Sequence, residues 1–568
     1  MSATSSDDPT AAAALLTRLG QLGVDYLFVN SGTDFPPLIE ALAAAQADGT
    51  KLPEALVMPH EGAAMGMAQG YWLATGRPQA VMAHTNVGLA NCAIGAINAA
   101  TDRVPILLFS GRTPATERDR FGARTVPIGW GQEMRDQTAL VREAVKWDYE
   151  LRFPEQVVEL VDRAHAIADS TPKGPVYLSL PREVLSAPCP AAELTRAPGQ
   201  KPAVAAPHPD AVEAAARILA EAERPVIFAQ RGAGSPEAFR ALAELTAERA
   251  IPVVQYWAVQ LAIAADHPMS AGIDPEPWIS EADAILVIDS LAPWSPDLHR
   301  PNASCRIVQL GPDPLYARFP VRHFGADVAL VGETGETLLA LAAAMRRLPR
   351  SPSTEPRRQL VEERNATSRA AMLAAARAGG GPSMSKAWVS LCLGEAIAGR
   401  DATVLSELGC PLGPLELQAY GSWYQEPHSG GLGWSFPCGL GLALADRQRL
   451  VVATMGDGSY IFANPVACHQ IAEALGLPLL VIVLNNGEWG AVRQSVLGLY
   501  PDGHAARANR VPLTALSPSP DFTSVAAASR AWARRVEHGA DLPQALADAM
   551  RHVDKQGTLA LLDVRVAG

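Results

Sequence analysis

The chain has 568 residues, of which 48% are hydrophobic and 19% are charged, a balance that is ordinary for a globular protein with large buried sheets. The formal net charge of −12 argues against nucleic acid or an anionic membrane surface as a partner. No apolar run approaches the length that spans a bilayer. The seven cysteines are scattered and include no C-x-x-C pair, so we expect reduced thiols rather than a disulfide framework or a zinc site.

The first residues, MSATSSDDPT, are polar and acidic ahead of the first apolar stretch, a pattern that is not typical of a signal peptide. Together with the reduced cysteines, this pattern predicts a cytoplasmic protein. A chain of this length is expected to form about three domains.

Residues 1–190 are predicted to form the first domain. Short β-branched or apolar runs alternate there with helical spacings of Ala, Gly and Leu, which predicts a doubly wound parallel sheet. The expected strands are residues 26–29, 55–58, 79–84, 105–109 and 175–180. A Pro- and Ala-rich linker is expected at 191–208.

A second α/β domain is predicted at residues 209–345 and a third at 384–568, separated by a linker with some helix at 346–382. In the second domain, the expected strands are residues 226–229, 251–255, 284–288 and 306–310. The predicted fold class is therefore α/β, with three doubly wound parallel-sheet domains.

The most informative stretch lies in the third domain, between residues 450 and 493. A strand at 451–454 ends at Gly456-Asp457-Gly458, Asn464-Pro465 is predicted to start a helix with Asn as its cap, and an apolar strand at 479–484 ends at Asn485-Asn486-Gly487. Ligands of such sheets lie beyond the carboxyl ends of the strands. A carboxylate, an amide oxygen and nearby glycines at that edge suit Mg²⁺ with a diphosphate.

This stretch, which opens with GDG and closes with NN, resembles the thiamine-diphosphate-binding motif of the thiamine-dependent enzymes. The tail NNGEWGAVR is most similar to benzoylformate decarboxylase and its relatives among 2-oxoacid decarboxylases and acetolactate synthases. The resemblance implies that Asp457, the Asn486 side chain and the Glu488 carbonyl hold the metal. The spacing from GDG to NN is slightly longer than is usual in the family. The alternative is a turn and a strand end in a sheet that binds nothing.

Glu61, in PHEGAAMGMAQGYWLATG, resembles the glutamate that shares a proton with the aminopyrimidine ring of the cofactor and so activates its thiazolium carbon. The alternative is a carboxylate that only caps a helix N-terminus. Leu432, in GGLGW, resembles the apolar residue beneath the cofactor that bends its two rings together, and its alternative is a core Leu. The resemblance implies further cofactor contacts from Gly433, Gly456, Gly458, Ser459, Trp489, Gly490, Glu407 and Cys410.

Two more residues are candidates for contact with the substrate. His84, in AHTNVGLAN, resembles an active-site histidine of benzoylformate decarboxylase and could move protons near neutrality; otherwise it is a hydrogen-bonded histidine at a strand end. Thr33, in NSGTDFPP, matches a serine that contacts the substrate carboxylate, or it is the cap of a following helix.

The sequence also departs from the benzoylformate decarboxylase pattern. The histidine of the middle domain has no clear counterpart, and Trp294 in the matching region is expected at most to line the site. Gln494-Ser495 stands where an aryl-binding relative would have aromatics, so an aromatic substrate is not indicated. The segment 230–234, QRGAG, is a plain strand-to-helix turn or, less well supported, part of a nucleotide or flavin loop.

The resemblance implies a thiamine-diphosphate- and Mg²⁺-dependent lyase, foremost a 2-oxoacid decarboxylase. An acetolactate synthase-like carboligase is the closest alternative, and a 2-hydroxyacyl-CoA lyase, a flavin-dependent oxidase and a non-catalytic cofactor binder are more distant ones. In the family the cofactor lies between the first domain of one chain and the third domain of another, so a homodimer or homotetramer is expected.

Overall fold

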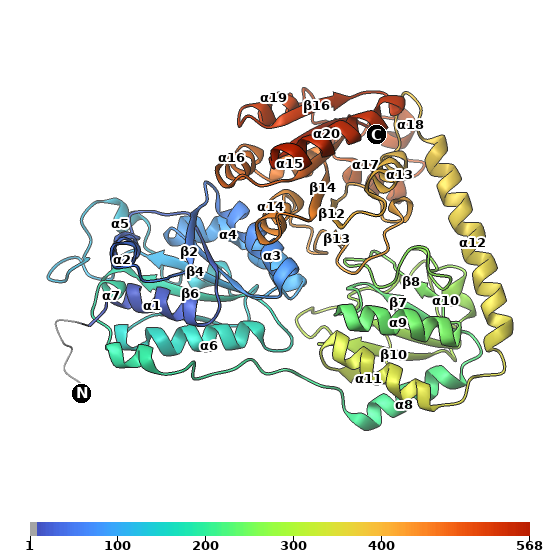
Figure 1. The fold of residues 1–568 in the computed structure, drawn as a ribbon, viewed down its shortest axis with the longest axis horizontal. Coiled ribbons are helices and arrows are strands. Elements are labelled where there is room, and N and C mark those ends of the chain that lie inside the picture. Colours follow the sequence, from blue (N-terminus) through green and yellow to red (C-terminus); the bar gives the residue numbers. More distant parts are fainter. Residues whose placement is uncertain (1–7, 568) are drawn as a thin grey trace.

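In a computed structural model that describes residues 8–567, the chain forms three parallel β-sheets, each covered by helices (Figure 1). The first sheet lies in the blue and cyan part of the chain, the second in the green part and the third in the orange and red part. The predicted α/β class with three doubly wound parallel sheets is confirmed.

The first sheet has the strand order β2-β1-β3-β4-β6-β5, and all its pairs are parallel. Its strands are β1 (Tyr26–Val29), β2 (Glu54–Val57), β3 (Gln79–Ala83), β4 (Ile106–Arg112), β5 (Asp148–Glu150) and β6 (Val176–Pro181). Its helices are α1 (Ala11–Gln21), α2 (Pro36–Asp48), α3 (Glu61–Thr75), α4 (Thr85–Thr101), α5 (Ile128–Gly131), α6 (Val157–Asp169) and α7 (Arg182–Leu185). The strand β5, which has only three residues, was not expected from the sequence.

The second sheet has the order β11-β10-β9-β7-β8. Its strands are β7 (Pro225–Ala229), β8 (Val253–Val254), β9 (Ala284–Ile288), β10 (Arg306–Gly311) and β11 (Val328–Val331), and its helices are α8 (Pro209–Glu221), α9 (Pro236–Arg249), α10 (Trp278–Glu281) and α11 (Thr334–Arg347). Most of the expected second linker is one long helix, α12 (Thr354–Ala378), which runs along the outside of the molecule from the second domain to the third (Figure 1).

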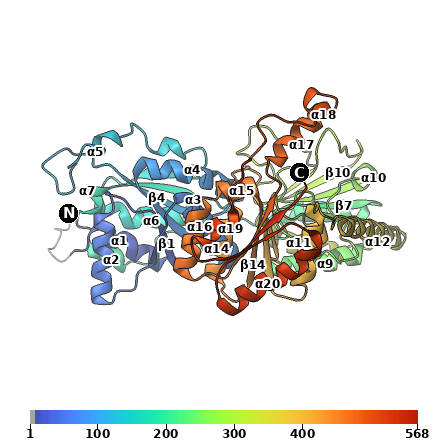
Figure 2. The same cartoon turned by 90° about the horizontal axis from the view of Figure 1, so that it is seen from above.

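The third sheet has the order β13-β12-β14-β15-β17-β16, the same topology as the first. Its strands are β12 (Ala402–Glu407), β13 (Trp423–Gln425), β14 (Leu450–Gly456), β15 (Leu480–Asn485), β16 (Trp532–Val536) and β17 (Ala560–Arg565). Its helices are α13 (Lys386–Ile397), α14 (Ser435–Ala445), α15 (Asp457–Phe462), α16 (Pro465–Leu475), α17 (Gly490–Leu499), α18 (His504–Ala508), α19 (Phe522–Ala527) and α20 (Leu542–Gln556). Figure 2 shows α17 and α18 projecting from the rest of this domain.

Two details around the predicted motif differ from expectation. Gly456 is followed at once by the short helix α15, where a loop was expected. The prediction that the Asn464 side chain caps α16 is wrong, because this residue has a φ of 52° and makes no side-chain cap bond. Its amide nitrogen lies 3.3 Å from His60 Nε2, so it contacts the first domain instead.

One hydrophobic core runs from the first sheet into the third through α3 and α14, and another joins the second sheet to the opposite face of the third. Small residues let α3 and α14 approach closely. A Cβ atom at Gly70 would lie 1.9 Å from the Cys438 carbonyl oxygen, and one at Gly441 would lie 2.1 Å from that of Met67. Because α3 starts at Glu61 and α14 follows Leu432, this packing fixes where two predicted site segments lie within one chain.

Within residues 8–567, none of the helices is both long enough and apolar enough to span a membrane.

Candidate active site

The predicted site residues gather at the carboxyl edges of the first and third sheets. In each sheet the strand order reverses between two neighbours, β1 and β3 in the first and β12 and β14 in the third. Ligands of open α/β sheets lie beyond the strand ends at such reversals. Glu61 and His84 follow β2 and β3, and Glu407 and Asp457 lie at the ends of β12 and β14.

Glu61 is the first residue of α3 and is 7% exposed. His60 caps this helix, since its Nδ1 accepts a hydrogen bond from the Gly62 backbone N–H at 3.0 Å. The Glu61 carboxylate accepts a hydrogen bond of 3.0 Å from the Asn91 amide on α4. A Cβ atom at Gly88 would lie 2.9 Å from Glu61 Oε1, so α4 makes room for the carboxylate.

His84 lies at the end of β3, and its side chain is half-buried. Its Nδ1 lies 2.5 Å from an Asp34 carboxylate oxygen, and its Nε2 lies 3.0 Å from the amide nitrogen of Gln132. The hydrogen bond to Asp34 raises the pKa of His84; burial opposes this, and the charges of Asp34 and Glu61 add to the increase. Neither Asp34 nor Gln132 was identified from the sequence.

Thr33 is exposed, and its carbonyl oxygen accepts a hydrogen bond of 3.1 Å from Arg182. The alternative that Thr33 caps the following helix is wrong, because α2 begins after Phe35 and has no side-chain cap. Its hydroxyl therefore stands at the same sheet edge as His84 without a role in starting α2.

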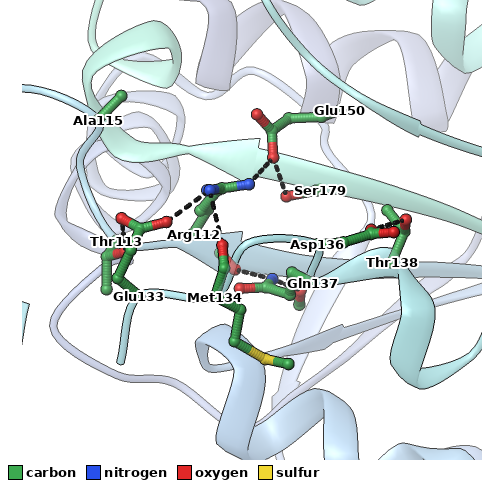
Figure 3. A network of polar contacts seen from close by, with 12 residues as sticks. Arg112, Thr113, Ala115, Glu133, Met134, Asp136, Gln137, Thr138, Glu150 and Ser179 are labelled. Carbon is green, nitrogen blue, oxygen red and sulfur yellow. Dashed lines mark hydrogen bonds and ion pairs between the residues drawn. The ribbon is translucent and has the colours of Figure 1, made fainter. Parts of the chain in front are cut away.

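A polar network holds residues 113–134, the segment that contains α5, against the first sheet (Figure 3). Arg112, at the end of β4, makes ion pairs with Glu150 and, at 2.5 Å, with Glu133, and it donates a hydrogen bond to the Met134 carbonyl. Arg124 and the Thr113 hydroxyl also bond to Glu133. Because Gln132 precedes Glu133, this network fixes the amide that contacts His84.

The predicted metal ligands meet at the ends of β14 and β15. Asp457 is 2% exposed, and its carboxylate accepts a hydrogen bond of 2.9 Å from the Gly487 N–H. Burial raises the pKa of Asp457, and the backbone N–H groups around it oppose the increase. The Asn486 amide oxygen accepts a hydrogen bond of 3.2 Å from the Glu488 N–H. Carboxylate, amide and carbonyl oxygens without thiol or imidazole are a ligand set that suits Mg²⁺.

The neighbouring predicted residues surround the same turn. A Cβ atom at Gly458 would lie 2.2 Å from the Trp489 ring, so the indole lies directly against this glycine. Ser459 is buried in α15, Gly456 ends β14 and Gly490 begins α17. Glycine at 458 thus leaves room for the Trp489 indole, which any larger residue would displace.

Glu407 has a clear local role, which the sequence did not predict. Its fully buried carboxylate accepts backbone hydrogen bonds of 2.6, 2.8 and 2.7 Å from Gly433, Trp434 and Ser435 at the start of α14. Burial raises its pKa, and these three N–H groups oppose the increase. Glu407 therefore holds the segment that carries Leu432, which is partly exposed. Cys410 is buried beside Thr454, and burial raises the pKa of its thiol to about 12.

Among residues 8–567, no hydrogen bond or ion pair joins Glu61 or His84 to Asp457, Asn486 or Glu488. The first and third domains of one chain are joined instead by the packing of α3 against α14 and by contacts such as the Asn98 amide, which donates a hydrogen bond of 2.9 Å to the Gly431 carbonyl.

The second domain contributes ionic contacts to the first. Arg231 bonds to Asp102 at 2.9 Å, and Arg103 bonds to Asp289 at 2.5 Å, beside a cavity of about 580 Å³. The segment 230–234 ends β7 and leads to α9, as expected for a strand-to-helix turn. The suggestion that Trp294 lines the site is wrong, because its ring is buried in the core of the second domain.

Comparison with known proteins gives matches along most of the chain. The N-terminal binding domain, the central domain and the C-terminal binding domain of the thiamine pyrophosphate enzymes match residues 9–140, 212–341 and 412–564. A probable 2-ketoarginine decarboxylase of Pseudomonas aeruginosa is 29% identical, over 98% of this chain and 94% of its own. An acetolactate synthase of Mycobacterium bovis is 27% identical, over 94% of this chain and 84% of its own.

A solved structure shows the same fold. The thiamine diphosphate-dependent 4-hydroxybenzoylformate decarboxylase of Rhodococcus jostii RHA1 superposes with a TM-score of 0.78 at 22% identity, covering 98% of this chain and 99% of its own. These matches and the three sheets agree with the resemblance found in the sequence. The chain therefore belongs to the thiamine pyrophosphate enzymes, within the group of decarboxylases and acetolactate synthases.

Proposed function

We propose that this protein is a thiamine-diphosphate- and Mg²⁺-dependent decarboxylase of a 2-oxoacid. The observation that carries the proposal is a half-buried imidazole, His84, at the same sheet edge as the buried carboxylate of Glu61. A histidine with a raised pKa holds a proton near neutrality and can deliver it to carbon. A decarboxylase needs that proton, whereas a carboligase adds a second carbonyl compound instead.

When bound, thiamine diphosphate supplies the nucleophilic carbon that adds to the 2-oxo group and the electron sink for loss of carbon dioxide. In this proposal Mg²⁺ is held by Asp457, the Asn486 side chain and the Glu488 carbonyl. Glu61 holds a proton at the aminopyrimidine ring, and Leu432 supports the bend of the cofactor. Thr33 binds the substrate carboxylate and His84 exchanges the proton. The remaining predicted contacts to the cofactor come from Gly433, Gly456, Gly458, Ser459, Trp489, Gly490 and Cys410.

The assembly and the location are part of the same proposal. We expect a homodimer or homotetramer, with each cofactor between the first domain of one subunit and the third domain of another, as the resemblance to the family implies. Sedimentation analysis would test this, and a catalytically active monomer would contradict it. All seven cysteines are free and buried, which supports a reducing, cytoplasmic setting.

The test is a panel of 2-oxoacids supplied with cofactor and Mg²⁺, including 2-ketoarginine, 4-hydroxybenzoylformate and pyruvate, with carbon dioxide and aldehyde as readouts. Glu61→Gln should retain cofactor and Mg²⁺ binding in calorimetry while its turnover falls by a factor on the order of 100 or more. Full turnover in that variant would refute the assigned role.

A carboligase is the second candidate, supported by the acetolactate synthase relative that aligns with 94% of this chain. It predicts an acyloin when an acceptor aldehyde or a second 2-oxoacid is added. Acyloin as the main product, with little free aldehyde, would replace the decarboxylase proposal.

A further inference from the structure

Asp34 and His84 form a close pair, in which a buried carboxylate contacts one nitrogen of the imidazole ring. Asp34 follows β1 and His84 follows β3, and these strands are adjacent and parallel, so both loops leave the sheet at the same edge. One carboxylate oxygen lies 2.5 Å from His84 Nδ1, and the other accepts a hydrogen bond of 3.2 Å from the Thr85 N–H. Asp34 is only 4% exposed, so the carboxylate is removed from water and held at both oxygens.

Two glycines make room for this pair. A Cβ atom at Gly32 would lie 2.1 Å from His84 Nδ1, and one at Gly111 would lie 1.5 Å from Asp34 Oδ2. Any other residue at either position would displace one member of the pair. The backbone of β4 and of the loop after β1 therefore accommodates the imidazole and the carboxylate in this one arrangement.

The contacts of the two ring nitrogens define the protonation of the ring. An ionised carboxylate can only accept, so Nδ1 carries a hydrogen, and in the neutral ring Nε2 has a free lone pair. The Gln132 amide nitrogen, 3.0 Å from Nε2, can donate to that lone pair. The next residue along the chain, Glu133, is held by the network shown in Figure 3. Nε2 therefore faces the neutral Gln132 amide while Nδ1 faces the buried carboxylate.

We propose that Asp34 is a positioning residue, which keeps His84 Nδ1 protonated and leaves Nε2 as the nitrogen that exchanges a proton with the reacting substrate. This proposal deepens the decarboxylase function proposed above and rests on it. The imidazolium gives its Nε2 proton to the carbon that has lost carbon dioxide, and the neutral ring regains a proton from water. The Nδ1–H bond to Asp34 persists through both steps, so the ring does not turn between turnovers.

The charged groups that act on His84 are Asp34, from the loop after β1, and Glu61, from α3. The end of α5 presents the neutral Gln132, while the neighbouring Glu133 is paired with Arg112 and Arg124. Loss of the Asp34 charge therefore leaves burial opposed only by Glu61, and the pKa of His84 should fall.

The decisive variant is Asp34→Asn, compared with Asp162→Asn as a matched control. Asp162 is another buried carboxylate of the first domain, 4% exposed and paired with Arg18, far along the chain from His84. Hydrogen exchange at the histidine C2 position, followed by peptide mass spectrometry, reports the pKa of His84 in the assembled protein without turnover. We expect the pKa of His84 to fall in Asp34→Asn and to stay unchanged in Asp162→Asn.

Turnover supplies the second readout. Because the protonated ring is the active form, a lower pKa should move the alkaline limb of the kcat profile to lower pH in Asp34→Asn. In a His84→Gln background the same change should have no further effect on kcat. An unchanged His84 pKa, or an equal shift in Asp162→Asn, would overturn the positioning role. A wild-type protein inactive on every 2-oxoacid would instead overturn the proposed function, while the exchange data still report on the pair.

If Asp34→Asn does not fold, Gly111→Ala replaces it. The added methyl group displaces the carboxylate without removing its charge, and the pKa of His84 should fall because the hydrogen bond to Asp34, the largest cause of the raised pKa, is lost. A folded Gly111→Ala protein with an unchanged His84 pKa would also refute the proposal.

Discussion

Glu426, immediately after β13, offers a test of the electrostatics of the third sheet edge. It lies beside Glu407, and its carboxylate accepts one long hydrogen bond of 3.4 Å, from the Leu408 N–H. Burial, and then the charge of Glu407, raise the pKa of Glu426 from 4.5 to about 8. The folded protein thus retains a proton that the unfolded chain releases, and its stability falls as the pH rises between those two values.

The size of the effect follows from the linkage relation, in which one pKa unit corresponds to about 1.4 kcal/mol. Between about pH 5.5 and about pH 8.5, the wild type should lose about 3 kcal/mol of stability through Glu426 alone. Glu426→Gln removes the ionisation. The free energy of unfolding of the variant, relative to that of the wild type, should therefore increase by that amount as the pH rises over this range. Thermal unfolding at the two pH values measures the difference.

The control is Glu395→Gln, in the same domain, whose carboxylate is 63% exposed. The difference in melting temperature between this variant and the wild type should be the same at both pH values. The reason is that an exposed carboxylate is surrounded by water in the folded chain as in the unfolded one. A melting-temperature difference between Glu426→Gln and the wild type that is the same at both pH values would show that Glu426 is ionised in the fold, and would refute the reasoning.

Three further variants test the third domain. Asp457→Ala should weaken Mg²⁺-dependent cofactor binding by more than tenfold in calorimetry, since the carboxylate is the one charged metal ligand proposed, and intact binding would contradict that assignment. Gly458→Ala should displace the Trp489 ring and weaken cofactor binding, with a thermal melt close to the wild type; equal affinity would show that the ring moves freely. Glu407→Ala should lower the free energy of unfolding by about 3 kcal/mol or more, because three backbone N–H groups, two of them in buried hydrogen bonds, lose their acceptor; an unchanged melting temperature would argue against that role.

The sequence predicted those features that depend on short-range patterns. The apolar run of β15 is buried at every position, as a parallel strand between two helical layers must be. The proximity of Asp457 to the segment of Asn486 could be predicted because each residue directly follows a strand, and strand ends of a parallel sheet share one edge. The α/β class followed from the same alternation of strands and helices.

Features that depend on strand order or on distant partners could not be predicted. Asp34 contacts His84 only because β1 lies beside β3 in the sheet. Glu407 caps α14 although β13 lies between the two in the chain. Trp294 was assigned to the site by a weak local match, whereas in the fold it packs between Phe228 and Phe324. The full length of the helix α12 could not be predicted from the sequence, because its charged, largely exposed residues lack a wide apolar stripe.

The contact between α3 and α14 limits how the protein can be divided for expression. A fragment cut at the first linker would expose a face of α3 with Met65, Met67 and Tyr71, all of which are buried in the whole chain. The same face carries glycines that contact the backbone of α14 in the whole chain. Such a fragment should aggregate or recruit its missing half. Co-production of residues 1–200 and 201–568 as separate chains is therefore expected to yield one complex, in which helix packing and the ion pairs between the first and second domains bridge the break in the polypeptide.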